Sequence, residues 1–273
     1  MRTPTAWRTK PLIVATDPFA ALVSRALGVA VDSVEAERLD REEEVAGAET
    51  QRVRWRGPDD AGSVLYRRYP AKASVEAALL PLLARRLAPV PKVHASGVPP
   101  RHAAEARPWL LMGDPGDIVA KRSDAIAALV AARAAVARDA ATLQSLGVPR
   151  LPPSRIRDEA LWSEELFEAS DFSRVERLAS SLDAARLDAV GATLVHGAFE
   201  GGNAVSGASG ATILGWSRAH LGCALIDDPG EDQDGARLAA LFAIRWHAWE
   251  ARESLRPRRQ AAELVLRVLR GYN

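Results

Sequence analysis

The chain has 273 residues, 48% of them apolar, and its 36 basic and 35 acidic side chains give a formal net charge of +1. This allows a substantial core in one domain or two apposed lobes. The balanced charge lacks the excess that nucleic acid or an anionic membrane demands, so we expect neither as a partner. A single cysteine, Cys223, excludes an intramolecular disulfide. No signal peptide and no apolar run of about 20 residues is seen, so we expect a cytoplasmic protein.

The first part of the chain alternates strand-like and turn-like segments around one helix. Residues 57–62, Gly-Pro-Asp-Asp-Ala-Gly, predict the turn of a β-hairpin. Leucines at helical spacing predict an amphipathic helix over 74–87, in spite of Pro81. The expected strands are 52–56, 63–69, 89–93 and 108–112.

From about residue 117 helical patterns dominate. The alanine-rich segment 123–146 predicts one long helix, with Ser123 as its N-cap and Gly147 as its stop. Further helices are expected in most of 161–192, through 238–249 and over 261–269. The pattern predicts an α+β protein with a β-rich N-terminal lobe, 1–112, and a mainly helical C-terminal lobe, 113–273.

Two segments of the second part carry a motif. Residues 194–205 read Leu-Val-His-Gly-Ala-Phe-Glu-Gly-Gly-Asn-Ala-Val, and 212–216 read Thr-Ile-Leu-Gly-Trp. The pair resembles the catalytic loop and metal segment of the aminoglycoside phosphotransferase and choline kinase superfamily, H-G-D-x-x-x-x-N and I-D-W. The matching residues are His196, Gly197, Asn203 and Trp216, with Gly222 and Asp227 similar to the G-D-P-x-x-D continuation.

The resemblance extends upstream and implies roles for three residues. Arg67, in the strand before Pro70, takes the place of the family's phosphate-contacting base, and Glu76 that of its acidic partner. Met112 closes the strand that leads to the hinge between lobes, and the resemblance implies that it binds the cofactor together with Arg67 and Glu76. The resemblance therefore implies a two-lobed protein-kinase-like fold, with an N-terminal antiparallel sheet and a mainly helical C-terminal lobe. It also implies ATP and magnesium as cofactors, with Asn203 and Asp227 as metal ligands.

Both carboxylates that the family uses for transfer are absent. Ala198 stands at the position of the aspartate that accepts the proton of the attacking hydroxyl, and Gly215 at the position of the aspartate that binds metal. Phosphoryl transfer needs the hydroxyl positioned and the phosphate charge neutralised by metal. These two losses argue against phosphoryl transfer, and the sequence predicts a catalytically impaired pseudokinase. The N-terminal nucleotide loop is poorly marked, with only Gly47 between candidate strands, which argues against tight ATP binding as well.

Three functions remain open from the sequence. The first is a silenced kinase fold that acts as a binding or regulatory module for a small molecule or a protein. The second is an active phosphotransferase on a small hydroxylated metabolite or antibiotic, with Glu200 or Asp227 as the substitute carboxylate. The third is a structural partner subunit with an empty pocket. Simpler interpretations of the same residues also remain open. Arg67 and Glu76 could form only an exposed ion pair, and Asn203 could cap a turn. His196 is expected to organise the loop, and the alternative is an ordinary polar residue near the core.

Overall fold

The computed structural model describes residues 8–9, 13–14, 18–40, 47–70, 75–97, 107–167, 169–199, 202–207 and 210–272. The chain divides into two compact units. The first unit is Met1–Val136 with Glu200–Ser217, and the second is Ala137–Phe199 with Arg218–Asn273. The lobe boundary after residue 112, expected from the sequence, stays a prediction. Within the described ranges no helix is both long and apolar enough to traverse a bilayer.

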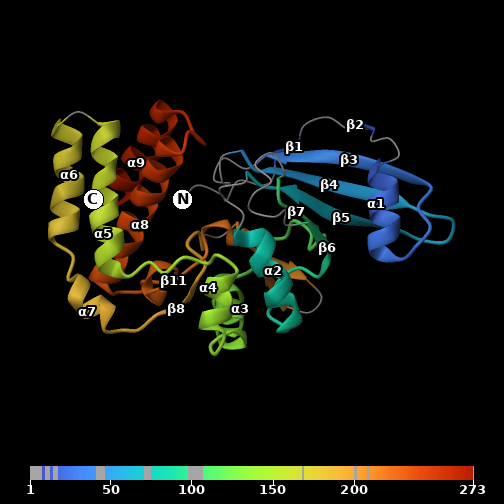
Figure 1. Ribbon diagram of the computed structural model, residues 1–273, viewed down its shortest axis with the longest axis horizontal. Coiled ribbons are helices and arrows are strands. Elements are labelled where there is room, and N and C mark those ends of the chain that lie inside the picture. The colour runs from blue at the N-terminus through green and yellow to red at the C-terminus, as the bar shows by residue number, and fades with distance from the viewer. Residues whose placement is uncertain are drawn as a thin grey trace. The chain divides into compact units, whose positions relative to one another are not determined.

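An antiparallel sheet forms the centre of the first unit (Figure 1). Its central hairpin pairs β4, Glu49–Arg56, with β5, Ala61–Arg68, and the pairing of Arg56 with Ala61 confirms the predicted turn. The strand order is β1-β3-β4-β5-β7-β6, and β2 also pairs with β3. The other strands are β1 (Arg8–Thr9), β2 (Ile13–Val14), β3 (Ser33–Asp40), β6 (Val93–Gly97) and β7 (Trp109–Gly113).

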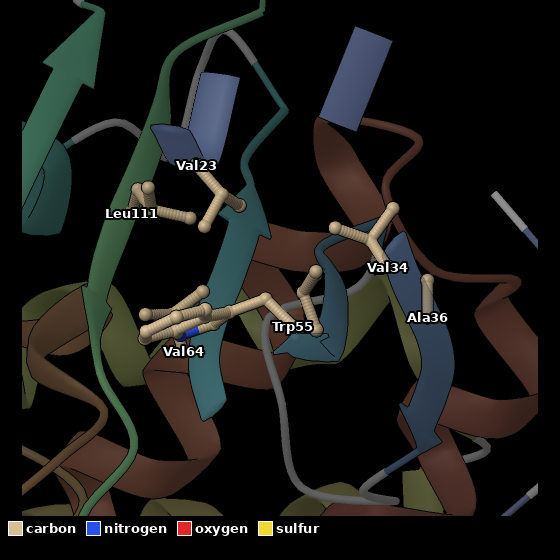
Figure 2. Close-up of a cluster of buried hydrophobic side chains, with 7 residues drawn as sticks. Val23, Val34, Ala36, Trp55, Val64 and Leu111 are labelled. Atoms are coloured by element: carbon tan, nitrogen blue, oxygen red, sulfur yellow. The ribbon is translucent and has the colours of Figure 1, made fainter. Parts of the chain in front are cut away.

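Helix α1, Pro18–Leu27, covers one face of this sheet (Figure 1). Figure 2 shows the apolar cluster between them, in which Val23 of α1 meets side chains of the strands. The buried members are Val23, Val34, Ala36, Val53, Trp55, Val64 and Leu111. Because neighbouring residues of a strand point to opposite faces, the side chains between them lie on the other face. That second face carries the candidate site.

The structure confirms one predicted helix and corrects one predicted strand. Helix α2 spans Val75–Arg85 and contains Pro81, while residue 74 lies outside the described residues. The strand expected over 89–93 is wrong, since β6 begins only at Val93 and runs to Gly97. The reason is chemical: Pro89 and Pro91 have no N–H group to donate to a neighbouring strand.

The long helix expected over 123–146 is also wrong, because the structure breaks it in two. Helix α3 spans Arg122–Ala135, with Lys121 rather than Ser123 as its N-cap, and α4 spans Ala140–Ser145. The N–H of Val136 bonds to the carbonyl of Arg133 three residues back, which tightens the last turn and ends the helix. Alanine favours helix throughout the segment and so does not mark this break.

Short strands complete the first unit. Hairpin β9–β10, Ala204–Gly207 with Gly210–Ile213, packs against α3 and leads into the 3-10 turn η3, Trp216–Arg218. The N–H of Ala120 bonds to the carbonyl of Ala204 at 2.9 Å, which ties the segment before α3 to this hairpin. The hairpin therefore fixes the residues on either side of it, Asn203 and Gly215.

The second unit is mainly helical, with α5, α6, α8 and α9 side by side (Figure 1). Helix α8 buries the predicted apolar face of Leu238, Leu241 and Phe242. A small antiparallel pair, β8 with β11, lies within this unit. The bounds are α5 (Pro153–Ala160), η2 (Leu161–Leu166), α6 (Ala169–Ser180), α7 (Ala184–Asp188), β8 (Thr193–Val195), β11 (His220–Gly222), η4 (Ala224–Ile226), α8 (Gln233–Arg252) and α9 (Arg258–Tyr272).

A buried carboxylate joins the end of α8 to the loop that precedes α9. Glu250 accepts hydrogen bonds from Arg256 Nε at 2.8 Å and lies 3.1 Å from His247 Nδ1. Burial alone would raise the pKa of Glu250, but hydrogen bonds from His247 and Arg256 outweigh it and lower the pKa to about 2. The carboxylate is therefore ionised in the folded unit at neutral pH.

Candidate functional site

The structure brings Arg67 and Glu76 together in the first unit. Arg67 Nη1 lies 3.4 Å from Glu76 Oε1 and 3.3 Å from Oε2, and both side chains are buried. A third residue, which the sequence analysis missed, completes the contact: Ser217 Oγ donates to Glu76 Oε2 at 2.7 Å and is buried as well. Both carboxylate oxygens of Glu76 are therefore engaged, and helix α2 is linked to β5 and to η3.

Strand register explains why Arg67 lies where it does. In β5 it is opposite Leu110 of β7, and Leu65 is opposite Met112. Alternation along both strands therefore places these four buried side chains on the face of the sheet away from α1. Arg67 and Met112, which the resemblance assigns to nucleotide binding, thus share one face, whereas that role itself stays a prediction.

A second buried arginine lies on this same face. Arg52 of β4 is opposite Leu65 and binds Asp114 through Nε at 2.6 Å and Asp117 through Nη2 at 2.6 Å. Ser63 Oγ also donates to Asp114 at 2.8 Å. Burial alone would raise the pKa of Asp114, but the hydrogen bonds from Arg52 and Ser63 hold it below its usual range. This network fixes the turn after β7 to the sheet, and sequence spacing gave no signal of it.

Asn203 and Gly215 lie against each other at the base of the β9–β10 hairpin. The carbonyl of Asn203 accepts the N–H of Leu214 at 2.8 Å. Gly215 has φ +78°, and a Cβ there would lie 3.1 Å from Asn203 Oδ1. Glycine tolerates this left-handed backbone at no steric cost, whereas among other residues asparagine and aspartate adopt it only occasionally. Position 215 therefore favours glycine, and a side chain there would require the amide of Asn203 to move by a few tenths of an ångström.

His196 and Asp227 meet in the second unit. The carboxylate of Asp227 accepts the backbone N–H of His196 at 2.7 Å and that of Gly197 at 2.8 Å, and both side chains are buried. The N–H of Ala198 donates to His196 Nδ1 at 3.2 Å, so Nδ1 is the acceptor nitrogen of this ring. These contacts support the interpretation of His196 as a residue that organises the loop.

Gly197 is required by its surroundings. Its φ is +78°, and a Cβ there would lie 2.6 Å from the carbonyl oxygen of Arg218. No side chain fits at that distance, which explains why a glycine follows His196 in the motif. Ala198, which follows it, offers a methyl group where the family's pattern has a proton acceptor.

The described residues offer a poor donor set for magnesium. None of the described His, Cys, Asp and Glu side chains gather in groups of three or more. Both oxygens of Asp227 already accept backbone N–H groups, and Asn203 supplies only a neutral amide oxygen, whereas magnesium favours carboxylates. Glu200, the other candidate carboxylate, lies outside the described residues. The assignment of Asn203 and Asp227 as metal ligands stays a prediction.

Comparison with solved structures shows the fold. The chain is similar to APH(2")-IIia in its complex with GDP and kanamycin, with TM-score 0.57, 16% identity and coverage of 93% of this chain and 96% of that one. It is similar to the choline kinase LicA from Streptococcus pneumoniae, with TM-score 0.56, 12% identity and coverage of 94% and 99%. The two-lobed, kinase-like α+β fold predicted from the sequence is confirmed.

A third solved structure is a thermostable form of the aminoglycoside phosphotransferase APH(4)-Ia in which one aspartate is replaced by alanine, in a ternary complex with ADP and hygromycin B. It has TM-score 0.54, 12% identity and coverage of 92% of this chain and 97% of that one. No protein with a curated description matches the sequence significantly. The model of the phosphotransferase enzyme family matches residues 42–271. The chain therefore belongs to the phosphotransferase enzyme family.

Proposed function

We propose that this chain binds a nucleoside triphosphate without transferring its phosphoryl group efficiently, and that it acts as a binding or regulatory module. One observation carries the proposal: the two positions that should hold catalytic carboxylates are Ala198 and Gly215, and the backbone at Gly215 is itself adapted to glycine. At Gly215 both the φ angle and the nearby amide of Asn203 disfavour a side chain.

The missing groups act at different points of the transfer step. A hydroxyl that attacks the γ-phosphorus must give up its proton, and the methyl group of Ala198 cannot accept it. The backbone N–H of Ala198 cannot serve either, because it is a donor and already bonds to His196 Nδ1. Without a carboxylate at 215, the charge on the phosphates lacks its metal counterion. Groups that act together in a transition state lose most of their effect when one is absent.

The phosphate-binding half of the site is better preserved. The guanidinium of Arg67 is always charged and can contact phosphate oxygens directly. Glu76 holds it, and Ser217 in turn holds Glu76. We therefore assign phosphate binding to Arg67, its positioning to Glu76, and part of the base-binding face to Met112. In this arrangement Arg67 contributes one positive charge beside the phosphates, and we propose that nucleotide binding persists without magnesium.

Two solved structures of the same fold contain a nucleoside diphosphate together with an aminoglycoside. The aspartate-to-alanine variant of APH(4)-Ia still forms a ternary complex with ADP and hygromycin B. APH(2")-IIia forms a complex with GDP and kanamycin. We infer by analogy that a nucleoside phosphate is a suitable ligand here, with adenine or guanine as the base to be tested.

Turnover is tested by phosphate release from ATP and GTP with magnesium, in the presence of aminoglycosides, choline-like alcohols and sugars. We expect no release above the background of a mock-purified sample. The matched variants are Asn203→Ala and Glu200→Gln. Robust release by the wild-type chain that either variant abolishes would overturn the proposal and establish an active phosphotransferase with a substitute ligand or base.

A further inference from the structure

Helix α2 ends in a backbone conformation that suits glycine but carries a leucine. Leu87 has φ +55°. The N–H of Ala88 bonds to the carbonyl of Leu83 at 3.0 Å, and the N–H of Leu87 bonds to that of Ala84 at 3.1 Å. This is the hydrogen-bond pattern of the Schellman motif, in which the left-handed position is usually glycine because a Cβ is crowded there.

Packing does not explain the leucine. Its side chain is 92% exposed, so it gains almost no burial that would offset the strained backbone. By contrast, Ser254, the other described non-glycine residue with positive φ, is small and polar. Backbone strain that folding does not require is concentrated where proteins bind ligands or partners. Leu87 is therefore a candidate contact residue.

Leu87 lines an open groove of about 530 Å³ between the end of α2 and the start of β6. Pro81, Ala84 and Val90 give it apolar walls, and Arg85 and Lys92 add two exposed cations. Neither cation forms an ion pair with a carboxylate of the described residues, although the chain as a whole has nearly equal numbers of acidic and basic groups. The groove thus combines apolar walls, a projecting leucine and two cations that pair with no carboxylate of the described residues.

We propose that this groove docks an acidic amphipathic segment of a partner protein. Apolar side chains of the segment would enter the groove and bury Leu87, while its carboxylates would pair with Arg85 and Lys92. A protein fits better than a membrane because the apolar residues line a concavity, which receives side chains, whereas insertion into lipid needs several apolar groups that project together. The proposal is independent of nucleotide binding.

The test is a selection of random linear peptides, displayed on phage, against the purified full chain. Counter-selection uses Leu87→Gly, which removes the contact while giving the backbone the residue that suits it. We expect this variant to melt at a higher temperature than the wild type, so any loss of binding cannot come from unfolding. The enriched peptides are then synthesised and their Kd values measured.

We expect enriched peptides to be acidic with interspersed apolar residues, and Leu87→Gly or the pair Arg85→Glu with Lys92→Glu to weaken binding about tenfold or more. Val130→Ser, on an exposed apolar residue of α3, is the matched control and should bind like the wild type. The proposal would be overturned if no peptides were enriched, if the enriched peptides had no excess of acidic residues, or if their Kd values were unchanged by these substitutions. Leu87-dependent binding to phosphatidylserine vesicles without peptide binding would assign the groove to a membrane instead.

Discussion

Replacing Asp227 separates its role as a backbone support from a role as a metal ligand. Asp227→Ala removes the acceptor of two buried N–H groups, those of His196 and Gly197, at 2.7 and 2.8 Å. A hydrogen bond to a charged group contributes about 1.5–3 kcal/mol. Because the two bonds share one carboxylate and do not add fully, we expect Asp227→Ala to lower the free energy of unfolding by roughly 3–5 kcal/mol.

Asp227→Asn is the finer perturbation. The amide keeps one acceptor oxygen but presents an NH₂ group to the second N–H, so we expect a loss of about 1.5–3 kcal/mol. Urea unfolding at neutral pH measures both variants, once with EDTA and once with magnesium. The losses should be equal in the two buffers, since the partners of the carboxylate are backbone N–H groups.

Glu231→Gln, on an exposed neighbouring residue, is the control and should unfold within about 0.5 kcal/mol of the wild type. Two results would refute the reasoning. A loss that appears only with magnesium would identify Asp227 as a metal ligand. A change below about 0.5 kcal/mol for Asp227→Asn would mean that the carboxylate does not support the loop.

Three further expectations concern other parts of the chain. Because the pKa of Glu250 is lowered, the ionised carboxylate contributes roughly 3 kcal/mol to the free energy of unfolding above about pH 4.5, and this contribution is lost as pH falls toward 2. In urea unfolding, the free energy of unfolding of Glu250→Gln should therefore fall less steeply below pH 4.5 than that of the wild type. An equally steep fall in both proteins would contradict this. Leu87→Gly should raise the free energy of unfolding by about 1 kcal/mol, measured by urea unfolding, because it relieves a left-handed backbone; a decrease would refute the strain argument. Gly215→Asp should destabilise the chain by about 1 kcal/mol or more, because its Cβ meets Asn203 at φ +78°, and should not restore ATP turnover without Ala198→Asp; a gain by Gly215→Asp alone in phosphate release would contradict this.

Patterns that repeat along the chain were readable from the sequence, and contacts between distant residues were not. The hairpin at 57–62 follows from turn chemistry, and Arg67 and Glu76 follow from a motif order that places them on adjacent elements. Ser217 has no such signal. It lies 141 positions from Glu76, and no sequence pattern marks this serine as a hydrogen-bond donor to that carboxylate. The break between α3 and α4 was missed because alanine is favourable on both sides of it.

The roles of site residues were harder to predict from the sequence where they depend on backbone conformation or backbone hydrogen bonds. The sequence shows that Gly215 lacks a carboxylate, but only the φ angle shows that the position now suits glycine. Asp227 matches a motif position that suggests a metal ligand, whereas its oxygens accept backbone N–H groups. Leu87 reads as the last residue of an amphipathic helix, and its strain and exposure appear only with the fold.

The central claim is that the chain binds nucleotide through Arg67 without magnesium. A thermal-shift titration with ATP and with GTP, in EDTA and in magnesium, tests it most directly, because a ligand of the native state raises the melting temperature by mass action. The variants are Arg67→Gln and, as matched control, Arg68→Gln on the adjacent exposed residue. We expect equal shifts in both buffers for the wild type and Arg68→Gln, and none for Arg67→Gln. A shift that requires magnesium, or no shift with either nucleotide, would contradict the account.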